Sequence, residues 1–184
     1  MRWTALFDDL EAQLEAADDA ELAAEVADRS RREAALLALH DRLGGSLGAP
    51  LTVQLPALGA LHGGLRDSGP DWLLLEEPGG REALVPLAAV LGVTGVGPRS
   101  SVPGSGGPVA RRLDLRWALR GLARSRAGVV VGLSDGSLLP GTLDRVGLDH
   151  LDLAEHPAGE VRRPTAVRSV RLVPLRALAV VRSG

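Results

Sequence analysis

Apolar residues recur at helical spacing in the first 45 residues of the chain. A first helix is predicted over residues 3–16, because five apolar positions follow one another at intervals of one, three or four residues. These positions are Trp3, Leu6, Phe7, Leu10 and Leu14. A second helix is expected from Asp18 or Asp19, either of which can cap it, to about Leu43, where Gly44-Gly45 ends it. The short link favours a helical hairpin over residues 1–45, and one long bent helix is the alternative.

The pattern changes to every second position in residues 129–155. Val129, Val131 and Leu133 alternate with other residues, as expected for a half-buried strand. Asp135-Gly136 then suits the positive φ angles of a tight hairpin turn. The chain returns and runs out again through a second set of alternating residues, and His150 and Asp152 between them are expected to face water. This set is Leu139, Gly141, Leu143, Leu151 and Leu153. The stretch predicts a strongly bent meander of short strands.

An earlier stretch, residues 51–77, repeats this pattern without a gap when it is shifted by 78 positions. Glycine and aspartate recur together with leucine, so that Gly63 matches Gly141 and Asp71 matches Asp149. After a longer insertion in the second copy, residues 84–87 match residues 172–175, both reading Leu-Val-Pro-Leu. Such self-similarity predicts two copies of one small β domain. The first copy has Ala57-Leu58-Gly59 where the second has Asp135-Gly136, so we expect the first copy to lack this turn.

The segments around the two copies complete the predicted domain organisation. Residues 98–110 form a flexible linker by composition, rich in glycine, proline and serine. A short helix with several arginines is expected at 111–126. The fold class is therefore predicted as α+β: an acidic helical hairpin (1–45), a first five-stranded β-barrel (46–97), the linker (98–110), and a basic helix with a second barrel (111–184).

Composition narrows the class of protein and divides the chain by charge. Cysteine is absent, which excludes disulfides and thiolate metal sites, and no apolar run is long enough to span a membrane. We expect a cytoplasmic protein without membrane contact. Net charge is −2, yet residues 1–45 carry eleven acidic residues against five arginines, and residues 111–184 carry thirteen arginines against seven acidic residues. The acidic polar face makes the N-terminal apolar stripe a packing or dimerisation face rather than a membrane surface.

The repeat resembles the Sm-like branch of the small SH3-type barrels. The resemblance lies in Val131-x-Leu133-x-Asp135-Gly136, in Leu139-x-Gly141-x-Leu143 and in Asp149-x-Leu151-x-Leu153. In Sm-like proteins a glycine on the second strand permits the sharp bend, and Gly63 and Gly141 stand at that place. The RNA-binding signature near the last turn is missing, so RNA binding does not follow from the resemblance. The whole chain is similar to an uncharacterised family of high-GC, actinobacterial-type bacteria, some of whose members are labelled transcription regulators.

Two patterns resemble sites of chemistry, and neither predicts an enzyme. Gly132-Leu133-Ser134-Asp135-Gly136 fits G-x-S-x-G, but a returning strand follows it where a nucleophile elbow needs a helix. Asp149-His150 has the composition of a general base or a metal site, but His150 aligns with Trp72, which indicates an exposed strand position. Asp71 and Asp149 are expected to accept backbone N–H bonds after a turn. We expect no catalytic residue, no metal and no cofactor.

The arginines of the C-terminal half carry the remaining hypothesis. Four arginines of the predicted helix at 111–126 have the spacing of one helix face, and four more lie towards the C-terminus. They are Arg112, Arg116, Arg120 and Arg124, and Arg162, Arg163, Arg168 and Arg171. Arginine suits phosphate geometry, although a solvated face or a partner for the acidic helices is the more ordinary interpretation. The sequence therefore favours a scaffold that binds a protein partner or itself, with a nucleic-acid-binding regulator as the alternative.

Overall fold

The computed structural model describes residues 2–102, 112–159, 163 and 166–184, and it divides the chain into two compact units. The first unit is Met1–Leu37 and the second is Ala38–Gly184. The second unit contains every strand of the described residues, so both copies of the sequence repeat belong to one compact body. The boundary between the units falls at residue 37, a few residues before the predicted end of the helical region at 45.

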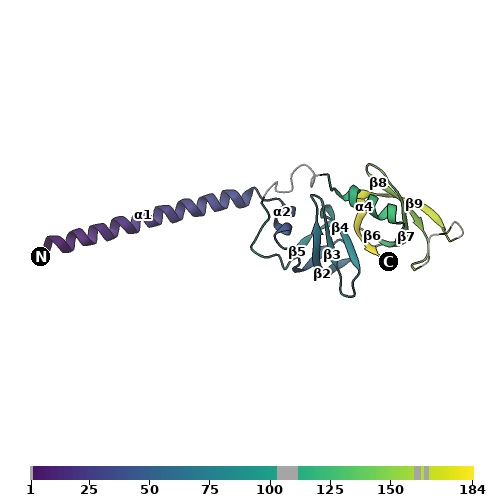
Figure 1. Ribbon diagram of the computed structural model, residues 1–184, viewed down its shortest axis with the longest axis horizontal. Coiled ribbons are helices and arrows are strands. Elements are labelled where there is room, and N and C mark those ends of the chain that lie inside the picture. Colours follow the sequence, from purple (N-terminus) through teal and green to yellow (C-terminus); the bar gives the residue numbers. More distant parts are fainter. Residues whose placement is uncertain (1, 103–111, 160–162, 164–165) are drawn as a thin grey trace. The chain divides into compact units, whose positions relative to one another are not determined.

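The first unit is one uninterrupted helix, α1 (Arg2–Ala35), which Figure 1 shows as a single rod. The prediction of a helical hairpin is therefore wrong for this segment, and the alternative of one long helix describes it. Asp18 and Asp19 lie inside the helix instead of capping a second one. No glycine or proline stands between residues 2 and 35, and an aspartate inside a solvated helix costs only a few tenths of a kcal/mol, which is too little to break it.

The second unit is built on an antiparallel sheet of ten strands. The first five are β1 (Pro50–Leu55), β2 (Gly59–Ser68), β3 (Trp72–Glu76), β4 (Glu82–Pro86) and β5 (Gly92–Thr94). The second five are β6 (Gly128–Leu133), β7 (Leu138–Val146), β8 (His150–Glu155), β9 (Ser169–Pro174) and β10 (Leu178–Ser183). Their order across the sheet is β5-β1-β2-β3-β4-β10-β6-β7-β8-β9, and the sheet is not closed. The protein is thus a mixed α+β protein, as predicted.

The two halves of the sheet repeat the same pairing scheme, residue by residue. Leu51 lies opposite Gly63 in the first half, and Val129 lies opposite Gly141 in the second. A register shift interrupts β2 and β3 between Leu65 and Asp67, and the same shift occurs between Leu143 and Arg145 in β7 and β8. Short 3₁₀ helices also correspond, η1 (Leu87–Ala89) to η2 (Leu175–Ala177). The sequence repeat is therefore a repeat of structure, down to its irregularities.

Two glycines allow β2 and β7 to lie very close to the backbone of the next strand. A Cβ atom at Gly63 would lie 2.6 Å from the carbonyl oxygen of Glu76, and one at Gly141 would lie 2.3 Å from that of Ala154. Both distances are shorter than any real Cβ contact, so a side chain at either place would push the next strand away. The structural role predicted for Gly63 and Gly141 fits this close approach of backbone to backbone.

Both halves also turn tightly between their first two strands. In the second half Asp135 Oδ1 accepts a hydrogen bond from the Ser137 N–H at 2.8 Å, and Gly136 has a φ of 91°. In the first half Ala57 has a φ of 51° and Gly59 a φ of 76°. The expectation that the first copy lacks the turn was wrong, because an alanine takes the left-handed conformation there.

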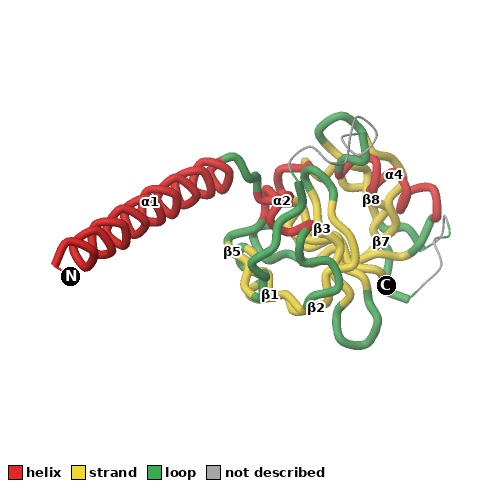
Figure 2. Tube along the Cα trace, turned by 60° about the vertical axis from the view of Figure 1, so that its left-hand side comes forward, coloured by secondary structure: helices red, strands yellow, loops and turns green. Residues whose placement is uncertain are grey.

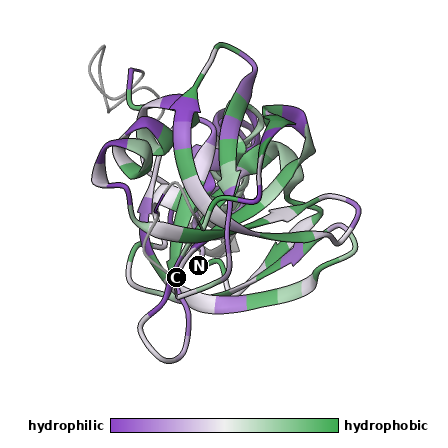
Figure 3. Ribbon diagram, turned by 90° about the vertical axis from the view of Figure 1, so that its right-hand side faces the viewer, coloured by the Kyte–Doolittle hydropathy of each residue, from purple (hydrophilic) through white to green (hydrophobic). Residues whose placement is uncertain are grey.

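Two short helices cover the sheet, one for each half. Helix α2 (Leu39–Gly44) packs near β2, and α4 (Leu115–Ser125) packs on β7 (Figure 2). Asp114 is the N-cap residue of α4, and its side chain accepts a hydrogen bond from the Trp117 N–H, as N-cap side chains commonly do. Colouring by hydropathy shows hydrophobic and hydrophilic segments following one another along the strands (Figure 3).

Part of the predicted linker is held in place. The Arg42 guanidinium donates to the carbonyl oxygens of Gly97, Pro98 and Arg99 at 3.1 to 3.2 Å. Ser101 also donates both its N–H and its hydroxyl to the carbonyl oxygen of Asp41. The chain therefore follows α2 closely as far as residue 101. Residues 103–110 of the predicted linker lie outside the described residues.

Candidate interaction surfaces

The two halves of the sheet are joined where β4 pairs with β10. Leu84 lies opposite Val181 and Ala83 opposite Arg182. Arg182 extends across this junction to Glu77, with a distance of 3.1 Å between Arg182 Nε and Glu77 Oε2. A further hydrogen bond runs from the Glu82 N–H to Ser183 Oγ at 3.0 Å. Backbone pairing and a largely desolvated ion pair together fix the register of the junction.

The junction also shares its core residues between the halves. Trp72 and Leu84 come from the first half, but they pack in the core cluster of the second half with Val131, Leu153 and Val181. Conversely, Ala179 and Val180 come from the second half and pack in the core cluster of the first. Each half therefore completes the core of the other.

The outer edges of the sheet are β5, which pairs only with β1, and β9, which pairs only with β8, so each has one side without a partner among the described strands. Leu172 on β9 is 67% exposed, whereas Leu84, which holds the equivalent place on β4, is 5% exposed. Leu91, just before β5, is also 67% exposed, whereas its equivalent Ala179 on β10 is fully buried. An edge strand offers unpaired backbone N–H and C=O groups to any further strand. The exposed apolar residues make these edges candidate contact surfaces.

Helix α1 exposes a second set of apolar side chains. Six large apolar side chains along it are at least half exposed. They are Trp3, Phe7, Leu10, Leu14, Leu22 and Val26. The basic residues near its end are engaged within the helix, since Arg29 pairs with Glu33, and Arg31 and Arg32 pair with Asp28. No helix in the described part of the chain is both long and apolar enough to cross a membrane.

The predicted nucleic-acid-binding arginines are distributed over two elements. Arg116, Arg120 and Arg124 lie on α4 at intervals of four residues and share one side of the helix, whereas Arg112 precedes the helix. Arg116 pairs with Asp114 at 2.8 Å. Arg112, Arg120 and Arg124 are exposed and make no ion pair with another described residue.

The second group of arginines lies near the sheet edge formed by β9. Arg163 and Arg168 are exposed, and Arg171 on β9 forms an ion pair with Glu155 of β8. That ion pair raises the pKa of Arg171 above its ordinary value. Arg162 lies outside the described residues. The structure therefore brings three of the eight arginines together on one helix face.

The Asp149-His150 pair differs from its equivalent, Asp71-Trp72, in its surroundings. Trp72 is 5% exposed and donates its indole N–H to the Leu113 carbonyl oxygen at 2.7 Å, while Asp71 Oδ1 accepts the Leu115 N–H at 2.7 Å. The expectation of an exposed strand position was wrong for Trp72, because α4 covers it. His150 is half-buried, and its Nδ1 lies 2.9 Å from Asp149 Oδ1. This hydrogen bond lowers the pKa of the exposed Asp149 carboxyl.

Ser134 and His156, the other residues considered for catalysis or metal binding, lie in a turn and directly after a strand. Ser134 lies in the turn between β6 and β7, and its N–H donates to the Ala177 carbonyl oxygen at 2.9 Å. The buried His156 has Nε2 at 2.8 Å from Thr142 Oγ1 and Nδ1 at 3.0 Å from the Pro157 carbonyl oxygen, so both ring nitrogens are engaged. Over the described residues there is no group of three or more histidine or acidic side chains suited to a metal ion.

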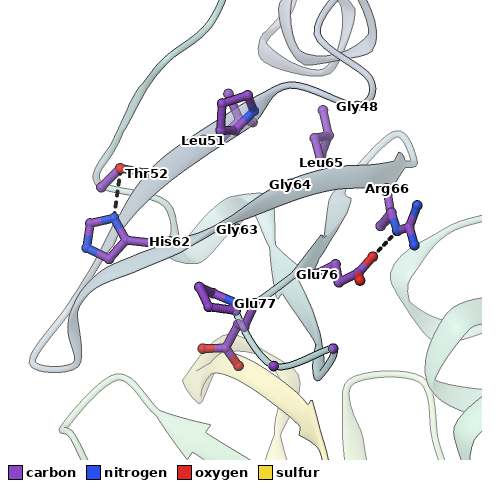
Figure 4. Close-up of a pocket in the computed structure, with 14 residues that line it drawn as sticks. Gly48, Leu51, Thr52, His62, Gly63, Gly64, Leu65, Arg66, Glu76 and Glu77 are labelled. Atoms are coloured by element: carbon purple, nitrogen blue, oxygen red, sulfur yellow. Dashed lines mark hydrogen bonds and ion pairs between the residues drawn. The ribbon is translucent and has the colours of Figure 1, made fainter.

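A shallow groove of about 650 Å³ crosses β1, β2 and the end of β3 (Figure 4). Thr52 Oγ1 lies 2.9 Å from His62 Nδ1 at one end, and Arg66 pairs with Glu76 at the other. Five glycines and two prolines form much of the remaining lining. These four polar side chains therefore bond to one another in pairs, and Glu77, which also lines the groove, pairs with Arg182 outside it. No protein-family model and no curated protein sequence matches the chain.

Proposed function

We propose that this protein is a non-enzymatic scaffold or interaction protein, which acts through protein–protein contacts or self-assembly. The observation that supports it is the pair of unpaired sheet edges, β5 and β9, with exposed apolar residues beside them. The apolar stripe of α1 offers a second surface of the same kind. Native proteins usually protect long apolar edges, and exposed apolar patches commonly mark sites of association.

In this proposal each half of the sheet is a small module of the SH3/Sm-like type. Both halves have the strand order of a five-stranded meander in which the last strand returns beside the first: β5-β1-β2-β3-β4 and β10-β6-β7-β8-β9. The bend glycines Gly63 and Gly141 and the 3₁₀ helix before the last strand support this assignment. In this proposal a partner binds by adding a strand to an exposed edge of a module and by contact with its exposed apolar side chains.

Sedimentation velocity on the full-length chain, from about 1 to about 100 µM, tests the proposal. We expect the apparent mass to rise with concentration, or a partner to be retained by the immobilised wild-type chain and lost with a Leu14→Lys/Leu172→Lys variant. Both side chains are exposed, so the variant should fold normally. A chain that stays monomeric throughout and retains no such partner would overturn the proposal.

A nucleic-acid-binding regulator is the second candidate, supported by the exposed arginines Arg112, Arg120 and Arg124. Phosphate contacts release counterions, so binding of generic DNA or RNA must strengthen as salt falls. Fluorescence anisotropy with a labelled oligonucleotide, at about 20 and about 200 mM salt, measures this directly. An Arg120→Gln/Arg124→Gln variant should weaken binding and reduce the salt slope. Absence of binding at low salt rejects this candidate.

A further inference from the structure

The two strands that form the internal junction, β4 and β10, each have an equivalent strand at an outer edge of the sheet. The free edge β9 is the repeat equivalent of β4, and the free edge β5 is the repeat equivalent of β10. Among the described strands, the chain therefore carries one β4-type edge and one β10-type edge that pair with no further strand. From this duplication we infer that the chain associates head to tail with further copies of itself, with β9 of one copy pairing antiparallel to β5 of the next. This inference rests on the proposed self-assembly and names its surface.

The register of the contact follows from the internal junction. Within the chain, Val181 lies opposite Leu84 and Arg182 opposite Ala83. The equivalents of these residues are Val93, Leu172, Thr94 and Arg171, since the last two strands of the copies are related by a shift of 88 positions. In the contact between copies, Val93 therefore lies opposite Leu172, and Thr94 lies opposite Arg171. The three-residue length of β5 is sufficient, because the internal junction itself pairs two residues of each strand.

Burial shows what the outer edges lack. Leu84 becomes 5% exposed because β10 and the second core cover it, and Leu172 is 67% exposed at the same place on an open edge. On the other strand, Val181 is 2% exposed and its equivalent Val93 is only partly buried. A β5 strand of a second copy would cover Leu172 as β10 covers Leu84. Removing these apolar surfaces from water supplies the driving force for the contact.

The charges at the edge favour β5 of another copy over an exchanged β10. In the junction one arginine, Arg182 on β10, pairs with Glu77. At the free edge the equivalent acid, Glu155, is already paired with Arg171 of β9. A β10 strand placed here would bring Arg182 beside Arg171, whereas β5 brings the neutral Thr94. The internal junction and the proposed contact between copies thus each contain one arginine and one glutamate, and neither places two arginines side by side.

A head-to-tail contact of this kind uses different surfaces on the two copies. It forms a closed ring when the rotation per copy divides a full turn, and an open filament when it does not. The two-fold related alternatives pair β9 with β9 or β5 with β5, and neither reproduces the junction, because each places two copies of the same strand side by side. The geometry of disulfide formation separates these arrangements.

The test uses single-cysteine variants, because the natural chain has no cysteine. Val93→Cys and Leu172→Cys chains, one with a mass tag, are mixed at about 50 µM and oxidised, and the crosslinked species are measured by intact mass. Directly opposed residues in antiparallel strands have Cα atoms about 4.5 to 5.5 Å apart, which suits a disulfide. We expect the mixed disulfide to exceed each of the two symmetric disulfides by at least about fivefold. A Val170→Cys chain, two residues out of register, serves as the control and should crosslink to Val93→Cys more slowly.

A second pair of variants measures association without cysteine. Leu172→Lys should raise the dissociation constant by at least about tenfold, because a lysine would have to be buried in the contact. Leu47→Lys is the matched control, since Leu47 is also exposed and its repeat equivalent, Ser125, is exposed and lies outside the junction.

Each outcome has a definite consequence. A dominant mixed disulfide together with weakened association of Leu172→Lys supports the inference, for rings and filaments alike. Dominant symmetric disulfides overturn it. Association that persists in Leu172→Lys without a mixed disulfide also overturns it, while the proposed self-assembly then stands through another surface such as α1. A chain without any association at the highest concentration rejects both the inference and self-assembly.

Discussion

Leu84 of β4 lies opposite Val181 of β10, and both side chains are almost completely excluded from solvent. This pair connects two halves that the sequence presents as separate repeats. Trp72 and Leu84 pack in one core, and Ala179 and Val180 pack in the other, so neither half is complete alone. The second unit should therefore unfold as one body, because residues that cross the junction belong to both cores.

Alanine substitutions at two equivalent leucines test how much the junction contributes. Leu84→Ala should lower the free energy of unfolding by about 2–5 kcal/mol, because it leaves a cavity in a shared core. Leu172→Ala removes the same atoms from an exposed position and should change the free energy by no more than about 0.5 kcal/mol. Urea denaturation, followed by circular dichroism at a dilute protein concentration, measures both. Equal effects of the two substitutions would show that β4 and β10 are not paired in solution.

The bend glycines give a second comparison. Gly141→Ala places a Cβ 2.3 Å from the Ala154 carbonyl oxygen, a backbone atom fixed by the strand pairing, and should cost about 1–3 kcal/mol. Gly63→Ala meets Glu76 in the same way and should behave similarly. Gly64→Ala is the matched control on β2, because nothing lies within 4 Å of a Cβ at that place. Thermal unfolding ranks the three variants, and a Gly141→Ala variant as stable as Gly64→Ala would contradict the close approach.

Much of the sheet could be predicted from the sequence, because its signals are local. Alternating apolar residues, the Asp135-Gly136 turn and the bend glycines each act within a few residues, and the structure has them where the repeat placed them. Burial of Trp72 could not be predicted, since it depends on α4, a segment more than forty residues away. The pairing of β4 with β10 could not be predicted either, because the sequences of two similar repeats do not indicate which of their edge strands pair.

The N-terminal helix shows a different limit of the sequence pattern. Apolar spacing locates the helical region, but it does not distinguish a cap at Asp18 or Asp19 from the continuous helix that the structure has at these residues. Aspartate is favoured at caps and is also tolerated on a solvated helix surface. The arginines show the reverse case, because spacing grouped Arg116, Arg120 and Arg124 as α4 has them, and their role stays a prediction.

Removal of residues 1–37 should leave the second unit folded. The chain forms two compact units that meet after Leu37, and both hydrophobic cores lie within the second unit. The truncated chain should therefore keep the near-ultraviolet circular dichroism of Trp72, and its unfolding midpoint should stay within about 2 °C of the full chain. Loss of the cooperative transition in the truncated chain would show that α1 stabilises the sheet.

The Asp114 cap of α4 makes stability depend on pH in a definite direction. Partial burial opposes ionisation of this carboxyl, but the hydrogen bonds from Arg116 and from the Trp117 N–H outweigh it and hold the pKa of Asp114 below its ordinary value of 3.8. An acid with a lowered pKa in the folded state stabilises the fold above its unfolded pKa, and this stabilisation is lost as pH falls through the folded value. Asp114→Ala should therefore cost about 1 kcal/mol near pH 7, mostly from the lost cap.

Asp114→Asn separates the charge from the cap, because its side-chain oxygen still accepts the Trp117 N–H. Asparagine is as good a cap as aspartate, so this variant should lose less stability than Asp114→Ala at pH 7. Its difference from the wild type should shrink as pH falls below about 4, where the wild-type carboxyl takes up a proton. Denaturation curves of the three chains between pH 7 and the acid limit of folding measure both effects. A difference between wild type and Asp114→Asn that stays constant with pH would show that the Asp114 charge contributes nothing, leaving the hydrogen-bonding cap as the whole of its effect on α4.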